Sequence, residues 1–187
     1  MQSKNKNENL INPRAAVVVA IVCAAAALRL LPHPMNFAPI GALALFGGAY
    51  FSSKRAALTV PLLSLVAGDI FTGFHPLIPY VYASFLVSVA IGFWLRDNKS
   101  ASRIGAATVA GAIQFFLITN LAMWVSSMGN YPKNAAGLAE CYIAGLPLFW
   151  NTLAGDAFYV ALLFGGMRLA EKRFPMLGGP LATAGHK

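Results

Sequence analysis

The stretch that decides the fold is residues 96–126, RDNKSASRIGAATVAGAIQFFLITNLAMWVS. It opens with the basic residues Arg96, Lys99 and Arg103 and continues as an apolar run up to Ser126. A hydrocarbon core of about 30 Å needs about 20 helical residues, so this run predicts a membrane-spanning helix over 101–126. Because Lys and Arg are retained on the cytoplasmic side, the basic residues place the start of this helix at the cytoplasm.

The same alternation of basic gaps and apolar runs extends along the whole chain. Only Arg29 and Lys133 lie near the alternate gaps. The other basic residues, which share the predicted cytoplasmic side, are Lys4, Lys6, Arg14, Lys54, Arg55, Arg96, Lys99, Arg103, Arg168, Lys172, Arg173 and Lys187. The sequence therefore predicts an all-α membrane protein, a six-transmembrane-helix bundle with both termini cytoplasmic.

The apolar runs also set the predicted domain organisation. The spans are expected at about 14–31, 39–51, 56–71, 77–95, 101–126 and 147–169. The second and third are short, so either is open to being tilted or partly re-entrant. Residues 127–146 are predicted to form the longest outer loop, part of it on the membrane surface. These spans make one integral membrane domain, 14–170, between cytoplasmic tails 1–13 and 171–187. The start of the chain also resembles a secretory signal, but an uncleaved first helix is the favoured interpretation.

Composition supports a membrane protein. Apolar residues make up 58% of the chain, charged residues only 11%, and the mean hydropathy is +0.63, which leaves too little polar surface for a water-soluble globule. The net charge of +8 is spread over short loops, so anionic lipid headgroups are the expected partner and nucleic acid is not. Cys23 and Cys141 lie at different depths, and no disulfide between them is expected.

Two segments repeat an Ala-Gly-Asp-x-Phe pattern, one around Asp69 and one around Asp156. Both aspartates are predicted at membrane depth near the outer side. A carboxylate that faces lipid is costly, so both should face the bundle interior or a water-filled cavity. One interpretation is that each accepts hydrogen bonds from an amide, a tyrosine or a helix N-terminus and only fixes packing. The convergence of both on one side favours a shared polar cavity.

Aromatic, amide and imidazole groups are also concentrated at the predicted outer side. His33 and His75 are each flanked by proline, which would hold the ring on a stiff loop. Alternatively, the histidines are solvated loop residues and Trp124 belongs to the aromatic belt of the membrane interface. The substrate-binding residues predicted from this pattern are Asp69, Asp156, His33, His75, Asn36, Tyr80, Tyr82, Asn120, Trp124 and Asn151.

The first span carries a ladder of small residues. Ala16, Ala20 and Ala24 recur every fourth residue and so lie on one helical face, where they let another helix approach closely. Gly41, Gly47 and Gly48 continue this theme in the second span. Packing inside the chain would explain the ladder equally well without a partner.

These features resemble a known class of transporter subunit. Six short spans, the alanine ladder and an outward cavity look like the substrate-binding S-components of energy-coupling-factor (ECF) vitamin transporters. Residues 29–50 (RLLPHPMNFAPIGALALFGGAY), 67–76 (AGDIFTGFHP) and 80–85 (YVYASF) look like an uncharacterised bacterial membrane family similar to the solitary cobalamin S-component. The resemblance covers about residues 14–170.

This resemblance implies a function and partners. It implies a multi-pass subunit of the bacterial inner membrane that captures a vitamin, cobalamin or a related corrinoid, from the outer side. It also implies that Ala16, Ala20 and Ala24 dock on a membrane coupling protein, with separate ATPases supplying energy. The cobalt-ligating cysteine of the cobalamin member has no counterpart between the third and fourth spans, which leaves His33 or His75 as possible ligands to a substrate metal.

Two other classes remain open at the sequence level. The chain has no Gly-Lys-Ser/Thr phosphate loop, and neither a cofactor nor an ATPase activity of its own is expected. An intramembrane aspartyl hydrolase would use Asp69 and Asp156 as a dyad, but Val66 and Leu153 stand where its Gly-x-Gly-Asp signature needs glycine. A non-catalytic cell-shape scaffold is the third possibility, and it predicts no outer cavity.

Overall fold

The computed structural model describes residues 13–28 and 31–177, and these residues form an all-helical structure without strands. The prediction of an all-α fold is confirmed. The elements are α1 (Pro13–Leu28), α2 (Ile40–Tyr50), α3 (Lys54–Thr72), α4 (Ile78–Trp94), α5 (Ala101–Val125), α6 (Ala135–Arg173) and the short 3-10 helix η1 (Pro175–Leu177). Residues 1–12 of the predicted N-terminal tail, residues 178–187 of the predicted C-terminal tail, and Arg29 and Leu30 lie outside the described residues.

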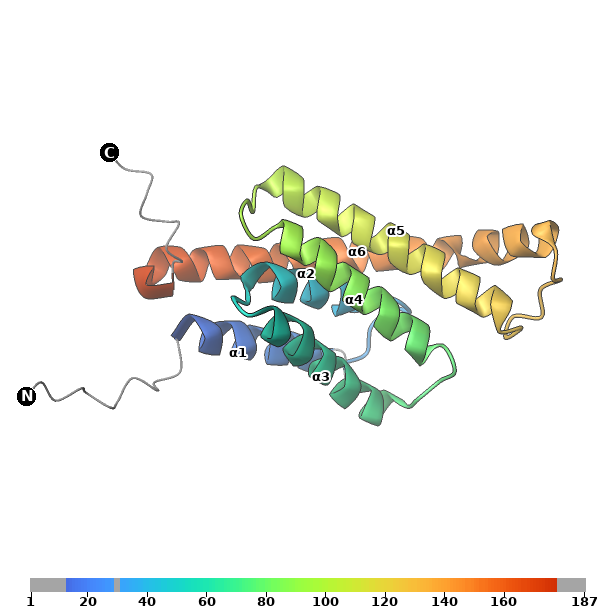
Figure 1. Cartoon of the computed structure of the whole chain (residues 1–187), viewed down its shortest axis with the longest axis horizontal. Helices are drawn as coiled ribbons and strands as arrows, with labels where there is room; N and C mark the ends of the chain where they lie inside the picture. Colours follow the sequence, from blue (N-terminus) through green and yellow to red (C-terminus); the bar gives the residue numbers. More distant parts are fainter. Residues whose placement is uncertain (1–12, 29–30, 178–187) are drawn as a thin grey trace, which may run out of the picture.

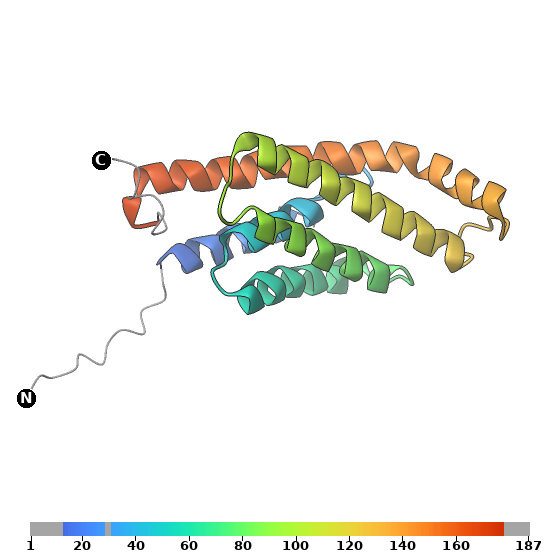
Figure 2. The same ribbon diagram turned by 45° about the horizontal axis from the view of Figure 1, so that its top comes forward.

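The helices run back and forth along the long axis of the molecule, as both ribbon views show (Figure 1, Figure 2). The start of α1, the α2–α3 and α4–α5 connections and the end of α6 gather at one end, which we call the basic end. The α1–α2, α3–α4 and α5–α6 connections lie toward the opposite end (Figure 1). The arrangement therefore brings the basic gaps of the sequence together in space.

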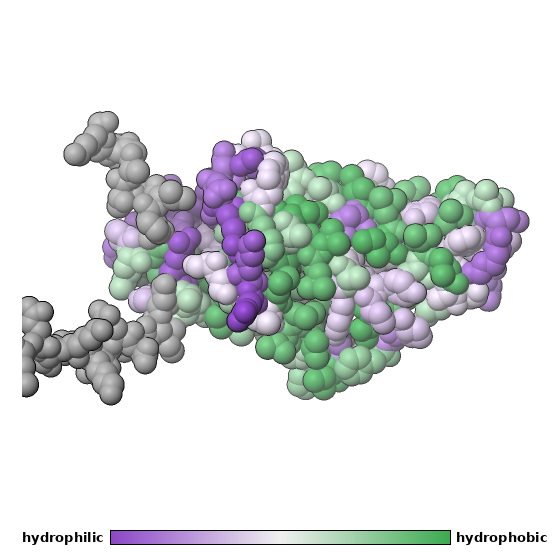
Figure 3. Space-filling model, viewed as in Figure 1, coloured by the Kyte–Doolittle hydropathy of each residue, from purple (hydrophilic) through white to green (hydrophobic). Residues whose placement is uncertain are grey.

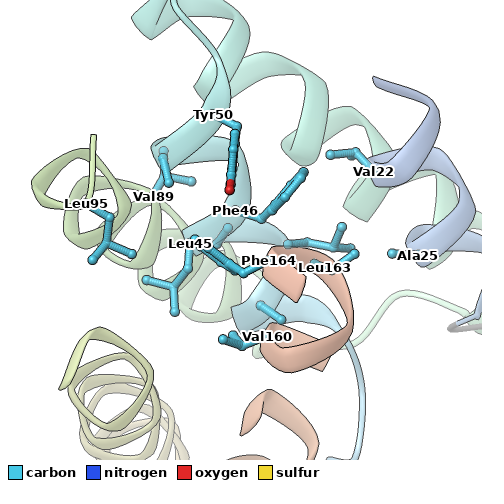
Figure 4. Close-up of a cluster of buried hydrophobic side chains, with 14 of the residues drawn as sticks. Val22, Ala25, Leu45, Phe46, Tyr50, Val89, Leu95, Val160, Leu163 and Phe164 are labelled. Atoms are coloured by element: carbon cyan, nitrogen blue, oxygen red, sulfur yellow. The ribbon is translucent and has the colours of Figure 1, made fainter. Parts of the chain in front are cut away.

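The short helix α2 forms the centre of the bundle. Every residue from Ala42 to Tyr50 is buried, and the rings of Phe46 and Tyr50 pack against Phe164 of α6, Phe46 edge to face (Figure 4). With 11 residues α2 is about 16 Å long, which is too short to cross a hydrocarbon core of about 30 Å. The predicted helix over 39–51 is present, but it does not make a complete crossing by itself.

Small residues let α2 sit against its neighbours. Gly48 of α2 and Gly92 of α4 meet backbone to backbone, because a Cβ added at Gly92 would lie 2.5 Å from the carbonyl oxygen of Leu45. A side chain at either position would force the helices apart. The glycines of the second predicted span are therefore used for packing inside the chain.

The C-terminal end of α2 is closed by a distant arginine. Arg96, just after α4, donates hydrogen bonds from Nε to the carbonyl of Gly48 and from Nη2 to that of Phe51, each at 2.9 Å. A cation at this end also matches the negative pole of the helix dipole. Lys99 lies beside this contact, donating to the Arg96 carbonyl at 2.7 Å with its ammonium 5.1 Å from the Tyr50 ring centre.

Helices α5 and α6 are the longest elements, and by length and apolar composition each is able to cross a membrane. The predicted outer loop over 127–146 is wrong from residue 135 onward, because α6 begins at Ala135 and continues for 39 residues. Asn134 caps its start by accepting a hydrogen bond from the N–H of Gly137 at 2.9 Å. Pro147 indicated a helix start, but it lies inside α6. A proline there has no backbone N–H, so the helix continues with one backbone hydrogen bond fewer.

The alanine ladder of α1 lies on the surface of the bundle. Val18, Val22 and Ala25 form the buried face of α1, whereas Ala16, Ala20 and Ala24 are all exposed. Packing against the other described residues therefore does not explain the ladder.

The remaining boundaries lie near the predicted ones. The helix α3 is longer than its predicted span and accommodates Pro61 in its interior, and α4 and α5 match theirs within one residue at either end. The predicted tail from residue 171 is helical up to Arg173, and Leu177 of η1 is buried against the bundle. Cys23 and Cys141 are both free thiols, as expected.

The surface in Figure 3 is apolar along the middle of the bundle and hydrophilic at connections between helices. Figure 3 shows apolar residues over the middle of the face in view, with hydrophilic residues at the α4–α5 connection and at the far α5–α6 connection. Exposed apolar side chains on the long helices include Val109, Ile113 and Leu117 of α5 and Leu162 and Leu169 of α6.

Candidate functional site

A cavity of about 430 Å³ lies between the segment before α2, the α3–α4 connection and helices α2 to α6. Its volume falls within the range of small-molecule sites, roughly 300–1,000 Å³. Six of the predicted binding residues line it, from five different segments of the chain: His33, Asn36, Asp69, His75, Asn120 and Asp156. We call this space the central cavity.

Asp156 closes the N-terminal end of α2. Its side chain is only 3% exposed, and its carboxylate accepts hydrogen bonds from the backbone N–H groups of Gly41 and Ala42. The local cap residue, Pro39, makes no such bond, so the first turn of α2 depends on a residue more than a hundred positions away. The carboxylate also matches the positive pole of the helix dipole.

Two glycines make room for this contact. A Cβ added at Gly41 would lie 2.5 Å from both carboxylate oxygens of Asp156. A Cβ added at Gly155 would lie 3.0 Å from the Cα of Phe37, so the segment before α2 packs directly on the α6 backbone. The Gly-Asp pair of the α6 motif therefore has a clear structural use: the glycine admits the segment, and the aspartate caps the helix that follows it.

Asn151 fastens the same segment one turn earlier on α6. Its side-chain amide donates to the carbonyl of Met35 at 3.0 Å. Asn151 does not line the central cavity, so the structure gives this predicted binding residue a positioning contact. Together Asn151 and Asp156 hold the non-helical residues 31–39 against the bundle.

The second aspartate is held by a tyrosine. Asp69 of α3 is 5% exposed, and its Oδ2 accepts a hydrogen bond of 2.7 Å from the hydroxyl of Tyr82 on α4. Tyr82 lies outside the cavity lining and acts through Asp69. The interpretation that each aspartate accepts structural hydrogen bonds is therefore confirmed, and both carboxyl groups also border the cavity.

The two histidines lie on the exposed edge of the cavity. His33 Nδ1 is 3.0 Å from the carbonyl oxygen of Pro34, and His75 belongs to the connection between α3 and α4. In the described parts of the chain, no group of three or more His, Cys, Asp or Glu side chains is arranged to hold a metal ion.

A polar clamp joins α4 and α5 beside the cavity, and the sequence reasoning missed it. Gln114 accepts from Ser84 Oγ at 2.9 Å and donates to the Ser84 carbonyl at 3.1 Å and to Ser88 Oγ at 2.8 Å. Ser88 lines the cavity. A glutamine in the middle of an apolar run was the available signal, because such a residue needs a partner inside the bundle.

The apolar walls were also missed. Phe85 of α4, Phe115 and Phe116 of α5 and Phe149 of α6 line the cavity. The rings of Phe116 and Phe149 are in contact, with centroids 5.2 Å apart. No local signal separates these phenylalanines from the many others of the chain.

Besides Asn151 and Tyr82, two further predicted binding residues do not line the central cavity. The Trp124 indole N–H donates to the Pro132 carbonyl at 2.8 Å, and Lys133 covers the ring while it caps the carbonyls at the end of α5. Tyr80 is 39% exposed at the start of α4 and does not line the cavity. Neither side chain therefore contributes to the wall of the central cavity.

The comparisons with known proteins identify a family. The sequence model of a family described as "Family of unknown function (DUF6580)" matches residues 9–177, which include every described helix. The chain belongs to this family. No curated protein and no solved structure matches the chain. In this DUF6580 member the central cavity combines apolar walls with a few polar groups, an arrangement that can hold a partly apolar molecule with hydrogen-bonding groups.

Proposed function

We propose that this protein is the substrate-binding membrane subunit of a micronutrient uptake system, with a vitamin such as cobalamin or a related corrinoid as its substrate. The observation that carries the proposal is the central cavity, in which buried aspartates, amides and imidazoles meet phenylalanine walls. A cell-shape scaffold needs no such cavity, so the cavity favours a binding function.

The apolar surface supports a location in the bacterial inner membrane. Only 22% of the most apolar stretch of α5 is buried, whereas the core helix of a soluble protein would be mostly buried. In this proposal six segments cross the membrane, and the second crossing is shared between residues 31–39 and α2. A non-helical segment at membrane depth is tolerated where it packs on protein or lines a cavity, and residues 31–39 do both.

The charge distribution supports an outward-facing cavity. Arg14, Arg96, Lys99 and Arg168 belong to the basic end, whereas the cavity includes His33 and His75 from the opposite connections. With the basic end and both termini in the cytoplasm, the cavity opens to the outer side.

The cavity volume bears on the substrate. A ligand of one or two rings fits within about 430 Å³, whereas a corrinoid would project from the cavity edge. At that edge the exposed His33 and His75 are the available ligands for a substrate metal. Because of these two histidines cobalamin is the first compound to test, and the cavity volume makes smaller vitamins the next.

The exposed face of α1 supports a docking role. Ala16, Ala20 and Ala24 are exposed in the described part of the chain, and their small side chains would let a helix of an ECF coupling protein approach closely. Energy for uptake would come from the separate ATPases of such a complex.

Uptake and binding test the proposal directly. In a corrinoid-dependent strain that lacks its own importer, the wild type should support growth on cobalamin, and mass spectrometry of the purified protein should detect a bound micronutrient. Asp69→Asn, Asp156→Asn and His75→Ala should each weaken binding of that compound in protein that remains folded. Failure to bind any corrinoid removes the cobalamin assignment, and the absence of both uptake and binding of any vitamin removes the function.

A bulky residue on the ladder tests the docking role. Ala20→Trp should abolish uptake or partner copurification while ligand binding to the purified protein survives, because residue 20 is exposed. Ala110→Trp is the matched control, because Ala110 is an exposed alanine of α5, away from the face of α1 and outside the cavity lining. Uptake by Ala20→Trp at the wild-type rate contradicts docking through this face.

A further inference from the structure

A second hollow lies on the protein surface between α5 and α6, and it shares no residue with the central cavity. Its volume is about 420 Å³. Apolar and small residues form most of its walls, including Gly105 and Val109 of α5 and Leu153, Ala157 and Gly165 of α6. We call it the α5–α6 groove.

The groove has the length and openness of a site for a single hydrocarbon chain. It extends along α6 from Leu153 to Arg168, which is about 22 Å at 1.5 Å per residue. One leaflet of a hydrocarbon core is about 15 Å thick, so the groove covers its full depth. Nothing lies within 4 Å of a Cβ added at Gly105 or Gly165, so these glycines keep the groove open and do not serve close packing.

One end of the groove is positively charged. Arg168 lines it, and Lys172 follows four residues later on the same face of α6. Helix α5 begins at Ala101, also in the lining, so the positive pole of its dipole is at the same end. The nearby Glu171 is paired with Arg14 at 3.7 Å. Phosphate is the chemical group that fits this combination.

We propose that the α5–α6 groove binds one acyl chain of an anionic phospholipid of the cytoplasmic leaflet, with the phosphate at Arg168 and Lys172. The proposal rests on the membrane location and orientation of the proposed function, but it does not depend on the substrate of the central cavity. The apolar groove selects the chain, and the charges select an anionic headgroup.

Filling the groove tests the acyl-chain half. The purified protein is mixed with phosphatidylglycerol, and native mass spectrometry counts the bound lipid. Gly165→Phe should lower the bound fraction at least fivefold. Gly166→Phe is the matched control, because a Cβ at Gly166 also meets nothing within 4 Å but this residue does not line the groove. Melting temperatures verify that both variants fold, and equal lipid binding by the two variants would overturn the proposal.

Removing charge tests the headgroup half. Wild-type protein should prefer phosphatidylglycerol to phosphatidylcholine with the same chains, and Arg168→Gln should reduce this preference about fivefold, or about 1 kcal/mol. Arg173→Gln is the control, because Arg173 lies five residues after Arg168 and so on a different face of α6 from Arg168 and Lys172. An unchanged preference in Arg168→Gln would refute the assignment of the phosphate.

A second copy of the chain is the competing occupant. If the groove were a dimer interface, Gly165→Phe would change the oligomeric state measured in detergent and leave lipid binding unchanged. That result would overturn the lipid proposal, whereas an unchanged oligomeric state with reduced lipid binding supports it. Uptake of the substrate is measured in parallel, and its failure alone bears on the proposed function only.

Discussion

The contact between Asp156 and the start of α2 makes a sharp prediction about stability. Asp156→Ala removes the acceptor of two hydrogen bonds and leaves the N–H groups of Gly41 and Ala42 without a partner for these bonds in the bundle interior. The loss of a helix cap costs about 1 kcal/mol, and a buried unsatisfied group costs about 1–3 kcal/mol. Removal of a buried polar side chain offsets part of this cost. We expect the free energy of unfolding to fall by about 2–4 kcal/mol.

Gly41→Ala probes the same contact from the other side. The new methyl group would lie 2.5 Å from both Asp156 oxygens, so the carboxylate must move away from α2. We expect a loss of about 1–3 kcal/mol, typical of an overpacked site. In the Asp156→Ala background the obstacle is gone, and alanine should then be neutral or up to about 1 kcal/mol better than glycine in a helix. The destabilisation by Gly41→Ala should therefore disappear in the Asp156→Ala background or become a small stabilisation.

A double-mutant cycle measures this coupling. Unfolding by sodium dodecyl sulfate in mixed micelles, followed by tryptophan fluorescence, gives the free energy for the wild type, both single variants and the double variant. The coupling energy should be about 2–3 kcal/mol. Gly165→Ala is the control, because its methyl group meets nothing within 4 Å and its small effect should be the same in both backgrounds. Additive effects of Gly41→Ala and Asp156→Ala would refute the capping interpretation.

Three further predictions concern the basic end and the orientation. Arg96→Ala should lower the free energy of unfolding by about 2–3 kcal/mol in the same assay, because two α2 carbonyls lose their donors; an effect below about 0.5 kcal/mol would contradict this. Burial lowers the pKa of Lys99 below its usual value of 10.5, and nearby Arg14 lowers it further. As the pH rises, Lys99 therefore loses its proton at a lower pH in the folded state than in the unfolded chain, and the stability should rise between the lowered pKa and 10.5. Lys99→Met should reduce this rise in thermal melts. In a background without Cys23 and Cys141, single cysteines at Ser53 and Asn98 should resist an impermeant maleimide in intact cells, while one at Asn130 should label; labelling at Asn98 would reverse the orientation.

The sequence by itself determined the helical class and the grouping of charge. Apolar runs and the basic residues between them are patterns along one dimension, so positions such as Arg96 and Arg168 could be assigned to one end before any contact was known. The same reasoning brought Asp69, Asp156 and the two histidines to one cavity, because buried carboxylates require an interior site.

Contacts between distant segments were decided only by the tertiary structure. The apolar run at 39–51 looks the same in sequence whether it crosses a membrane or forms a short helix buried inside the bundle. The short buried helix α2 has its two ends closed by Asp156 and Arg96, which come from other elements. The roles of Tyr82 and Asn151 likewise depend on partners from other elements. The start of α6 at Ala135 shows the related limit of local signals, since Pro147 was compatible with a helix start and with a helix interior. Hydropathy and charge constrain which segments are buried, but which buried groups meet is fixed by packing in three dimensions.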